Sequence, residues 1–259
     1  MGKIKRKHKK WLKIAAGTLA FILIGIVLTA ANAFVGNPVS AALANKAVQT
    51  HLDQTYAGMD LYLERKARYN FKDGSYTAIA ASKSSNDTKF YIAVRKGEIL
   101  WDEYEFAVLS KQTTIDRLSR EYSEIVRQLI AREAGGDWGE VRVMYDDNYN
   151  RQYDEYLELD MPFDKSLPIP ANLSMGLHAD QMDAAFIGKS LTKVHDLLVE
   201  RGYAMEHYNI YGENDTHLIS INGVKPEHII SGQLVQKIEK ALELGEYEGI
   251  SAFMKGGEK

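Results

Sequence analysis

Several residue patterns in this 259-residue sequence match parts of catalytic or phosphate-binding motifs, but each lacks an element that its chemistry needs. Gly188-Lys189-Ser190 matches the end of a phosphate-binding loop, yet Asp183 stands where that loop requires its first glycine. Ser190 and Lys193 have the Ser-x-x-Lys spacing of a nucleophile and its base, without the Ser-Asp-Asn and Lys-Thr-Gly elements that accompany it. We therefore interpret both patterns as turns of an ordinary helix.

One acidic stretch resembles a calcium-binding loop. Asp146, Asn148 and Asn150 fit positions 1, 3 and 5 of an EF-hand, but Arg151 replaces the glycine at position 6 and Leu157 the glutamate at position 12. The sharp turn and the bidentate ligand are both missing. A looser calcium site stays open as an alternative, and a solvated connection between strands is the simpler interpretation.

Two histidines fall on strands that we predict to form a hairpin around residues 212–215. If Tyr211 lies opposite Thr216, the side chains of His207 and His217 point to opposite faces of the hairpin, because strand residues alternate between faces. The two imidazoles then cannot share an ion, and we expect His217 to pack in the core. The sequence predicts no metal site and no cofactor.

Paired carboxylates and clustered aromatic residues give two further candidates. Glu158 and Asp160 are expected on one face of a strand, about 7 Å apart, a separation that glycoside hydrolases use. Residues 101–106 mix aromatic and acidic side chains, as Trp-Asp-Glu-Tyr-Glu-Phe, and such mixtures suit recognition of sugars or peptides. We assign no catalytic residue, leave the binding residues unknown, and keep a hydrolase with dispersed carboxylates as an alternative.

The composition excludes several classes of protein. The chain is 45% hydrophobic and 26% charged, which is typical of a globular fold, and it has no cysteine for a disulfide, a thiolate zinc site or a lipid anchor. Residues 1–13 carry seven cations and no acid, whereas residues 36–259 hold the other 25 of the 32 cations and all 35 acids. An acidic body argues against binding to nucleic acid.

Residues 14–35 form an apolar run without a formal charge. Twenty-two residues at about 1.5 Å each span about 33 Å, enough for a hydrocarbon layer of about 30 Å. We predict a transmembrane helix whose partner is the lipid bilayer, with the basic tail 1–13 in the cytoplasm and residues 36–259 outside the cell membrane. A signal peptide cleaved after Ala33, at Ala31-Asn32-Ala33, is the alternative.

The predicted fold class is α+β, with the N-terminal transmembrane helix followed by two small helix-plus-antiparallel-sheet units over residues 36–134 and 135–259. In the first unit, a type I′ turn at Asp73-Gly74 would place Tyr69 opposite Ala78. A helix is predicted over residues 38–55, and it would bury Val39, Leu43, Ala47 and Leu52. A strand is predicted on each side of residues 73–74, and two more near residues 90–94 and 99–101. A second helix is predicted over residues 112–133.

The second unit is predicted to begin with a strand over residues 138–143 that pairs with residues 156–161. The three prolines in residues 162–175 indicate a loop across the surface. A helix over residues 179–201, the hairpin of residues 205–211 and 216–222, and one long helix from Pro226 to about residue 242 would complete it.

The sequence resembles the YfjL-like group of membrane-anchored proteins of Gram-positive bacteria, most clearly over residues 36–133. The resemblance rests on Gly36-Asn37-Pro38, Thr55-Tyr56, Arg68-Tyr69-Asn70-Phe71-Lys72-Asp73-Gly74-Ser75-Tyr76, Asn86-Asp87-Thr88-Lys89-Phe90 and the stretch over residues 104–122. It implies a surface protein and assigns no catalytic residue. A helix followed by an antiparallel sheet is also similar in architecture to cystatin-like and PepSY-like modules, so an inhibitory module is a second alternative.

These observations together predict a single-pass membrane-anchored extracytoplasmic protein that is not an enzyme. We expect it to act as a binding or regulatory module at the cell surface. Its partner would be a surface protein, a peptide or a wall ligand.

Overall fold

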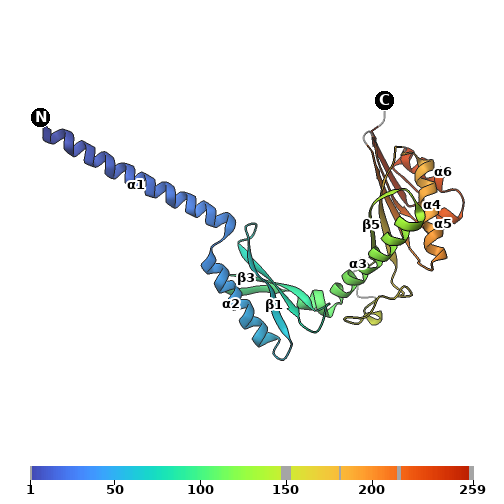
Figure 1. Cartoon of the computed structure of the whole chain (residues 1–259), viewed down its shortest axis with the longest axis horizontal. Coiled ribbons are helices and arrows are strands. Elements are labelled where there is room, and N and C mark those ends of the chain that lie inside the picture. Colours follow the sequence, from blue (N-terminus) through green and yellow to red (C-terminus); the bar gives the residue numbers. More distant parts are fainter. Residues whose placement is uncertain (1, 147–152, 181, 215–216, 257–259) are drawn as a thin grey trace. The chain divides into compact units, whose positions relative to one another are not determined.

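The computed structural model describes residues 2–146, 153–180, 182–214 and 217–256. The chain forms two compact units, residues 1–109 and 110–259, and each combines helices with one sheet (Figure 1). The α+β class and the N-terminal apolar helix are as predicted. The structure divides the chain after Leu109, whereas the expected division was after residue 134. The reason is that α3 (Gln112–Leu129) packs in the core of the second unit.

The first unit begins with the long helix α1 (Gly2–Val35), followed by α2 (Pro38–Thr55). Asn37 caps α2, since its Oδ1 accepts a hydrogen bond from Ser40 N at 2.8 Å, and Pro38 stands at the first helical position. The bounds of α2 are as predicted and Leu52 is buried as expected, but Val39 and Leu43 of the expected stripe are exposed. Ala44, Val48 and Leu52 face the sheet, and the early apolar residues of the helix point away from it.

Four antiparallel strands form the first sheet in the order β1-β2-β3-β4. The strands are β1 (Leu61–Asn70), β2 (Ser75–Ser82), β3 (Lys89–Arg95) and β4 (Glu98–Asp102), and a π-helical turn, η1 (Glu105–Leu109), follows them. Phe90, Ile92 and Val94 are fully buried, as their alternation predicts. Much of the remaining core of this unit is alanine.

The first hairpin of this sheet has a different turn from the one expected. Tyr69 pairs with Tyr76, not with Ala78, so four residues connect β1 to β2. Of these four, only Gly74 has positive φ, and a type I′ turn needs two such residues. That turn occurs between β3 and β4 instead, where Lys96 and Gly97 have φ of 54° and 85°.

The second unit contains a mixed sheet of six strands in the order β5-β6-β7-β8-β10-β9. Its β6–β7 pair is parallel, whereas its other pairs are antiparallel. The strands are β5 (Asp137–Tyr145), β6 (Ala171–His178), β7 (His207–Glu213), β8 (His217–Val224), β9 (Glu246–Tyr247) and β10 (Ile250–Gly256).

The expected partner of β5 is wrong. Residues 156–161 are not a strand, because a 3₁₀ turn, η3 (Asp154–Tyr156), precedes them and Asp160 takes a positive φ of 61°. β5 pairs instead with β6, which starts directly after Pro170 inside the segment expected to be a loop. Strands β9 and β10 were also not predicted, and β10 pairs along β8.

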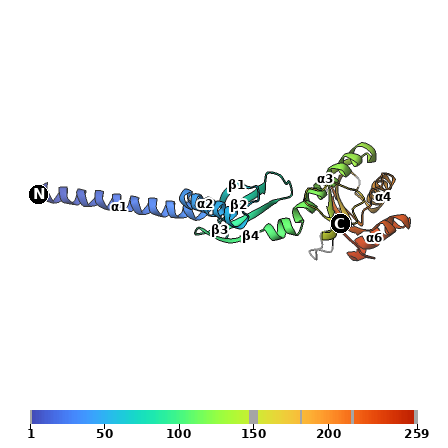
Figure 2. The ribbon, with the colours of Figure 1, turned by 90° about the horizontal axis from the view of Figure 1, so that it is seen from below.

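Helices cover one face of this sheet, and Figures 1 and 2 show α4 and α6 beside it. They are α3, which continues as the π-helical turn η2 (Ile130–Ala134), α4 (Ala184–Glu200), α5 (Pro226–Ile230) and α6 (Leu234–Leu244). The single long helix expected from Pro226 is two helices, since Gly232 has a φ of 71° between them.

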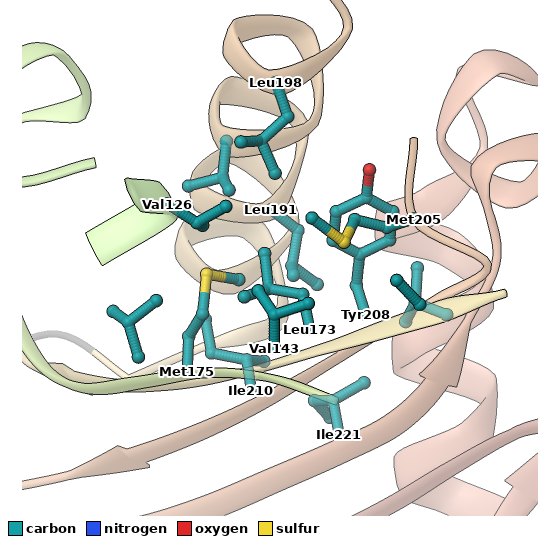
Figure 3. Packing of buried hydrophobic residues seen from close by; sticks show 14 of the residues in the cluster. Val126, Val143, Leu173, Met175, Leu191, Leu198, Met205, Tyr208, Ile210 and Ile221 are labelled. Atoms are coloured by element: carbon teal, nitrogen blue, oxygen red, sulfur yellow. The ribbon is translucent and has the colours of Figure 1, made fainter. Parts of the chain in front are cut away.

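The core of the second unit lies between these helices and the sheet. In Figure 3, Leu191 and Leu198 of α4 point toward Leu173, Ile210 and other side chains of the strands. Leu173, Leu191 and Leu198 are completely buried. Large aliphatic side chains therefore hold this unit together.

Candidate functional site

The apolar part of α1 is uncovered. An 18-residue segment, Lys13–Ala30, is long and apolar enough to cross a membrane, and none of it is buried against the part of the chain that the structure describes. Such a helix suits either a membrane span or an N-terminal signal sequence. Trp11 and Phe34, near its two ends, are exposed.

The second sheet has one polar face, opposite its core. Along β6, Leu173, Met175 and Leu177 are buried, whereas the residues between them are half-buried. The polar face consists of Glu140, Arg142 and Met144 on β5, Asn172, Ser174, Gly176 and His178 on β6, His207, Asn209, Tyr211 and Glu213 on β7, Leu218, Ser220 and Asn222 on β8, and Ser251, Phe253 and Lys255 on β10. Most of these side chains are polar and uncharged.

A row of hydrogen-bonding groups crosses the middle of the polar face. Ser174 lies opposite Arg142 on one side and opposite Asn209 on the other. Asn209 Nδ2 donates to Ser174 Oγ at 3.3 Å, and its Oδ1 accepts from Gly223 N at 2.9 Å. The row continues through Asn222, which pairs with Ser251. These bonds fix the orientation of the central amide before any ligand arrives.

A shallow pocket of about 310 Å³ lies on this face. Tyr211 stands at its side, opposite Gly176, and its side chain is 42% exposed. A bulge near Gly139 lies against Gly176, so backbone without side chains forms this part of the pocket floor. Partial burial and a 3.2 Å hydrogen bond to Glu213 raise the pKa of Tyr211, which keeps its hydroxyl neutral.

The charges around the pocket are balanced. Arg142 forms an ion pair with Glu140 at 2.5 Å, and both side chains are largely exposed. Amides and hydroxyls that both donate and accept hydrogen bonds, next to an exposed aromatic ring, are suited to an uncharged ligand that is rich in hydroxyl groups.

Helix α3 covers the outer edge of β5. Ser123 Oγ accepts a hydrogen bond from Val143 N at 2.8 Å and lies 3.0 Å from the Val143 carbonyl oxygen. Ser119 Oγ accepts from Tyr145 N at 3.2 Å. A pocket of about 440 Å³ lies between α3 and β5 and shares Glu140, Arg142 and Met144 with the pocket on the polar face. These serines therefore occupy backbone groups that a partner strand would need.

The first unit contains a hydroxyl–imidazole–carboxylate chain that the sequence analysis missed. His51 Nε2 lies 2.6 Å from Asp102 Oδ2, and His51 Nδ1 lies 3.1 Å from Thr55 Oγ1. Tyr56 donates to the same carboxylate oxygen at 3.0 Å, and burial, followed by this bond, raises the pKa of Tyr56. The group ties the end of α2 to β4. Only the spacing of His51 and Thr55 on one helix was visible in the sequence.

The residues of the phosphate-loop and Ser-x-x-Lys patterns lie within α4. Gly188 is buried, and a Cβ there would lie 2.8 Å from Val235 Cγ2, so this glycine allows α4 and α6 to approach closely. Ser190 is half-buried and Lys193 is exposed. Close helix packing accounts for the glycine of the pattern.

The two candidate histidines point to different faces of the second sheet. His207 lies on the polar face, where its Nδ1 is 3.0 Å from Asn172 Oδ1. Tyr211 pairs with Ser220, so the expected register is wrong, and His217 is only half-buried and not a core residue. Among the described residues, no group of three or more histidines and acids could hold a metal ion.

The buried histidines of this unit are His195 and His228. His195 Nδ1 lies 2.8 Å from the hydroxyl of Tyr208 inside the core, and burial lowers the pKa of His195.

Two sequence patterns remain, the calcium-loop pattern and the paired carboxylates. Asn148, Asn150 and Arg151 of the calcium-loop pattern lie outside the described residues. Glu158 and Asp160 lie in a loop, so their predicted strand spacing is wrong.

The aromatic residues of the segment 101–106 are divided between two environments. Trp101 and Phe106 are exposed, whereas the ring of Tyr104 packs 4.7 Å from that of Tyr56 and 5.2 Å from that of Phe90. This segment therefore contributes partly to the packing of the first unit and partly to its surface.

Comparison with protein-family models gives two matches. Residues 8–103 match the model described as YfjL-like, N-terminal domain, and residues 121–239 match the YfjL-like C-terminal domain. The gap between the two matches contains the division between the two structural units. No curated protein and no solved structure matches the chain.

Proposed function

This chain belongs to the YfjL-like family, and we propose that it is a single-pass membrane protein whose two folded units lie outside the cytoplasm. The observation that carries the proposal is the apolar stretch of α1, none of which is buried. From Trp11 to Phe34 the helix rises about 34 Å, enough for a hydrocarbon layer of about 30 Å, and Trp11 lies where an interfacial Trp is typical.

The charge distribution supports the orientation. Seven cations and no acid precede the apolar run, and positive residues next to a membrane span favour the cytoplasmic side. The acidic residues 36–259 would then face the exterior. The resemblance to anchored proteins of Gram-positive bacteria adds the cell surface of such an organism as the setting.

In this proposal the protein acts by binding and not by catalysis. The polar face of the second unit presents fixed amide and hydroxyl groups beside the Tyr211 ring. Its balanced charges suit a neutral glycan of the cell wall better than a charged polymer. Neither of two candidate catalytic patterns forms an assembled site, since Ser190 and Lys193 lie in the packed helix α4 and Glu158 and Asp160 lie in a loop.

The membrane topology is tested by labelling single cysteines, because the chain has none of its own. Lys3→Cys in the basic tail and Lys72→Cys in an exposed turn are treated in intact cells with a membrane-impermeant maleimide. We expect labelling of Lys72→Cys in intact cells and of Lys3→Cys only after permeabilisation. Labelling of Lys3→Cys alone in intact cells would reverse the proposed orientation.

The signal-peptide alternative gives a different result in the same cells. Cleavage after Ala33 would remove Lys3→Cys and release a shortened chain into the medium. A full-length chain that stays in the membrane fraction supports the anchor.

The binding proposal is tested with full-length protein in lipid nanodiscs and purified, insoluble cell-wall glycan. We expect the protein to sediment with the glycan, and Tyr211→Ala to weaken binding about tenfold through loss of the aromatic contact. Tyr91→Ala in the first unit is the matched control, because Tyr91 is also 42% exposed. No sedimentation, an equal loss in both variants, or turnover of the glycan would contradict a binding role at this face.

A strand-addition inhibitor is less compatible with the second unit. Its outer edge at β5 is bonded to α3 by Ser119 and Ser123. The opposite edge is β9, which has two residues. β9 pairs with only Ile250 and Ser251 of β10, so the described part of this edge leaves a short stretch, residues 253–256, for such recognition.

A further inference from the structure

Large apolar side chains of the first unit are exposed at one end, where α1 stops. Phe34 and Val35 end α1, Val39 and Leu43 lie on the first turns of α2, and Phe71 lies in the turn between β1 and β2. All five are more than half exposed. Exposed apolar side chains that gather in one place mark an interaction surface.

A short, packed connection joins the end of α1 to this part of the unit. Gly36, the first residue after α1, has a φ of 72°, and a Cβ there would lie 2.7 Å from both Tyr69 Cγ and the Tyr76 hydroxyl. The amide of Asn37 donates to that hydroxyl at 3.0 Å. The rings of Phe34 and Phe71 are 6.3 Å apart between centroids. The connection is therefore short and packed, and the exposed apolar residues stay close to the end of the helix.

The antiparallel topology brings three segments to this end: the start of α2, the β1–β2 turn and the β3–β4 turn. A pocket of about 440 Å³ is lined by residues of all three, including Leu43, Gly74 and Lys96. We call this the joint end of the first unit.

Charge is distributed unevenly between the joint end and the opposite end of the first unit. Lys72, Arg95 and Lys96 are exposed in the two turns of the joint end. At the opposite end, where α2 and β4 finish, Asp60 and Glu105 are exposed instead. The cations therefore stand beside the exposed apolar residues, together with the exposed acids Asp73 and Glu98 of the same end.

We propose that the joint end rests in the headgroup layer of the bilayer that α1 spans. Three features favour lipid as the occupant: the apolar run ends one residue before Gly36, the exposed apolar residues continue from it, and neighbouring Lys and Arg side chains suit phosphate headgroups. The inference rests on the proposed membrane anchor. It adds that the first unit is bound to the membrane surface and does not swing freely above it.

The experiment measures the distance of single fluorescent cysteines from lipid in full-length protein. The protein is reconstituted in vesicles of phosphatidylcholine and phosphatidylglycerol that contain a headgroup-spin-labelled lipid. Lys72→Cys reports on the joint end, and Lys83→Cys, an exposed lysine in the β2–β3 turn, is the matched control at the other end. We expect at least twofold stronger quenching at Lys72→Cys.

A second variant tests the role of the exposed apolar residues. Phe71→Ser in the Lys72→Cys background should reduce quenching toward the level of Lys83→Cys. Leu100→Ser, a change at an exposed apolar residue of β4, should leave it unaltered.

Leu23→Cys in the middle of α1, measured with an acyl-chain-spin-labelled lipid, separates the two proposals. If Leu23→Cys is quenched while Lys72→Cys and Lys83→Cys are equally weak, the docking proposal is overturned and the anchor stands. If Leu23→Cys is not quenched, the anchor itself fails. Close approach of two Lys72→Cys labels without quenching by lipid would assign the joint end to a second copy of the chain and overturn the docking proposal.

Discussion

The two folded units bury side chains of different size. In the first unit, the buried residues include Ala44, Ala67, Ala78, Ala80, Ala81, Ala93 and Ala107. In the second, leucine, isoleucine, valine and methionine fill the space between helices and sheet. The first unit therefore buries many small side chains, and the second buries mainly large aliphatic ones.

The difference also extends to the surface. The first unit leaves Val39, Leu43 and Phe71 exposed at the joint end, while the second keeps most of its large aliphatic residues inside and presents amides and hydroxyls on its open face. The first unit therefore exposes apolar surface at the joint end, and the second exposes a polar face. The difference in buried side-chain size can be tested by shortening a side chain in the core of the second unit and enlarging one in the core of the first.

The largest effect is expected from truncation of the second core. Leu173→Ala removes a completely buried side chain and should lower the free energy of unfolding of that unit by about 2–5 kcal/mol. Amide hydrogen exchange of the full-length protein reports each unit separately. Leu244→Ala, at a residue that is mostly exposed, is the control. Equal loss of protection in both units would show that they do not unfold independently.

Enlargement should be the damaging change in the first core. Ala80→Leu places a larger side chain at a fully buried position between Leu63 and Phe90 and should cost about 1–3 kcal/mol through overpacking. The same exchange measurement detects it, and Ala42→Leu on the exposed side of α2 is the control. A neutral result at Ala80 would mean that α2 can move away from the sheet.

A smaller effect is expected at the edge of the second sheet. Ser123→Ala removes the acceptor of the Val143 amide and should lower the stability of the second unit by about 1 kcal/mol. Exchange of the β5 amides should rise more than that of β7. Ser251→Ala on the polar face serves as the control, and unchanged β5 exchange would show that α3 does not protect this edge.

The smallest effect is a dependence of the stability of the second unit on pH. Burial lowers the pKa of His195 and of His228 in the folded state. Their neutral forms therefore stabilise the fold fully above the unfolded pKa of about 6.5, and this stability is lost as the pH falls toward the folded values. Thermal unfolding should show a lower Tm for the second unit below that pH.

A matched pair of variants tests whether His195 causes this pH dependence of Tm. His195→Gln should reduce the fall in Tm at low pH. His178→Gln, at an exposed residue of β6, should not change that fall. If both variants retain the full slope, the buried imidazole of His195 is not its source.

Periodicity predicted the elements whose pattern is local. The bounds of α2 follow from Asn37 and Pro38, and the buried face of β3 follows from alternation of Phe90 with Ile92. Strand pairing was harder, because the register of β1 with β2 depends on a four-residue turn and on bulges that alternation does not reveal. β6 was missed because Pro170 directly precedes it and prolines normally indicate a loop.

The candidate site could not be predicted without β6. The polar face needs Ser174 and Gly176 between Arg142 and Tyr211, and these residues come from strands that are adjacent in space and distant in sequence. The contact of His51 with Asp102 is hidden for the same reason, since 51 residues separate them. The apolar run, by contrast, is continuous and needs no partner to be recognised.

The serine hydroxyls on α3 have a consequence for self-association. An uncovered edge strand is a template on which further chains can add, and repeated addition produces fibres. Because Ser119 and Ser123 already bond the outward backbone groups of Val143 and Tyr145, copies crowded together cannot polymerise through β5 until α3 moves away. Helix α3, and not another strand, thus protects this edge of the sheet from the addition of further strands.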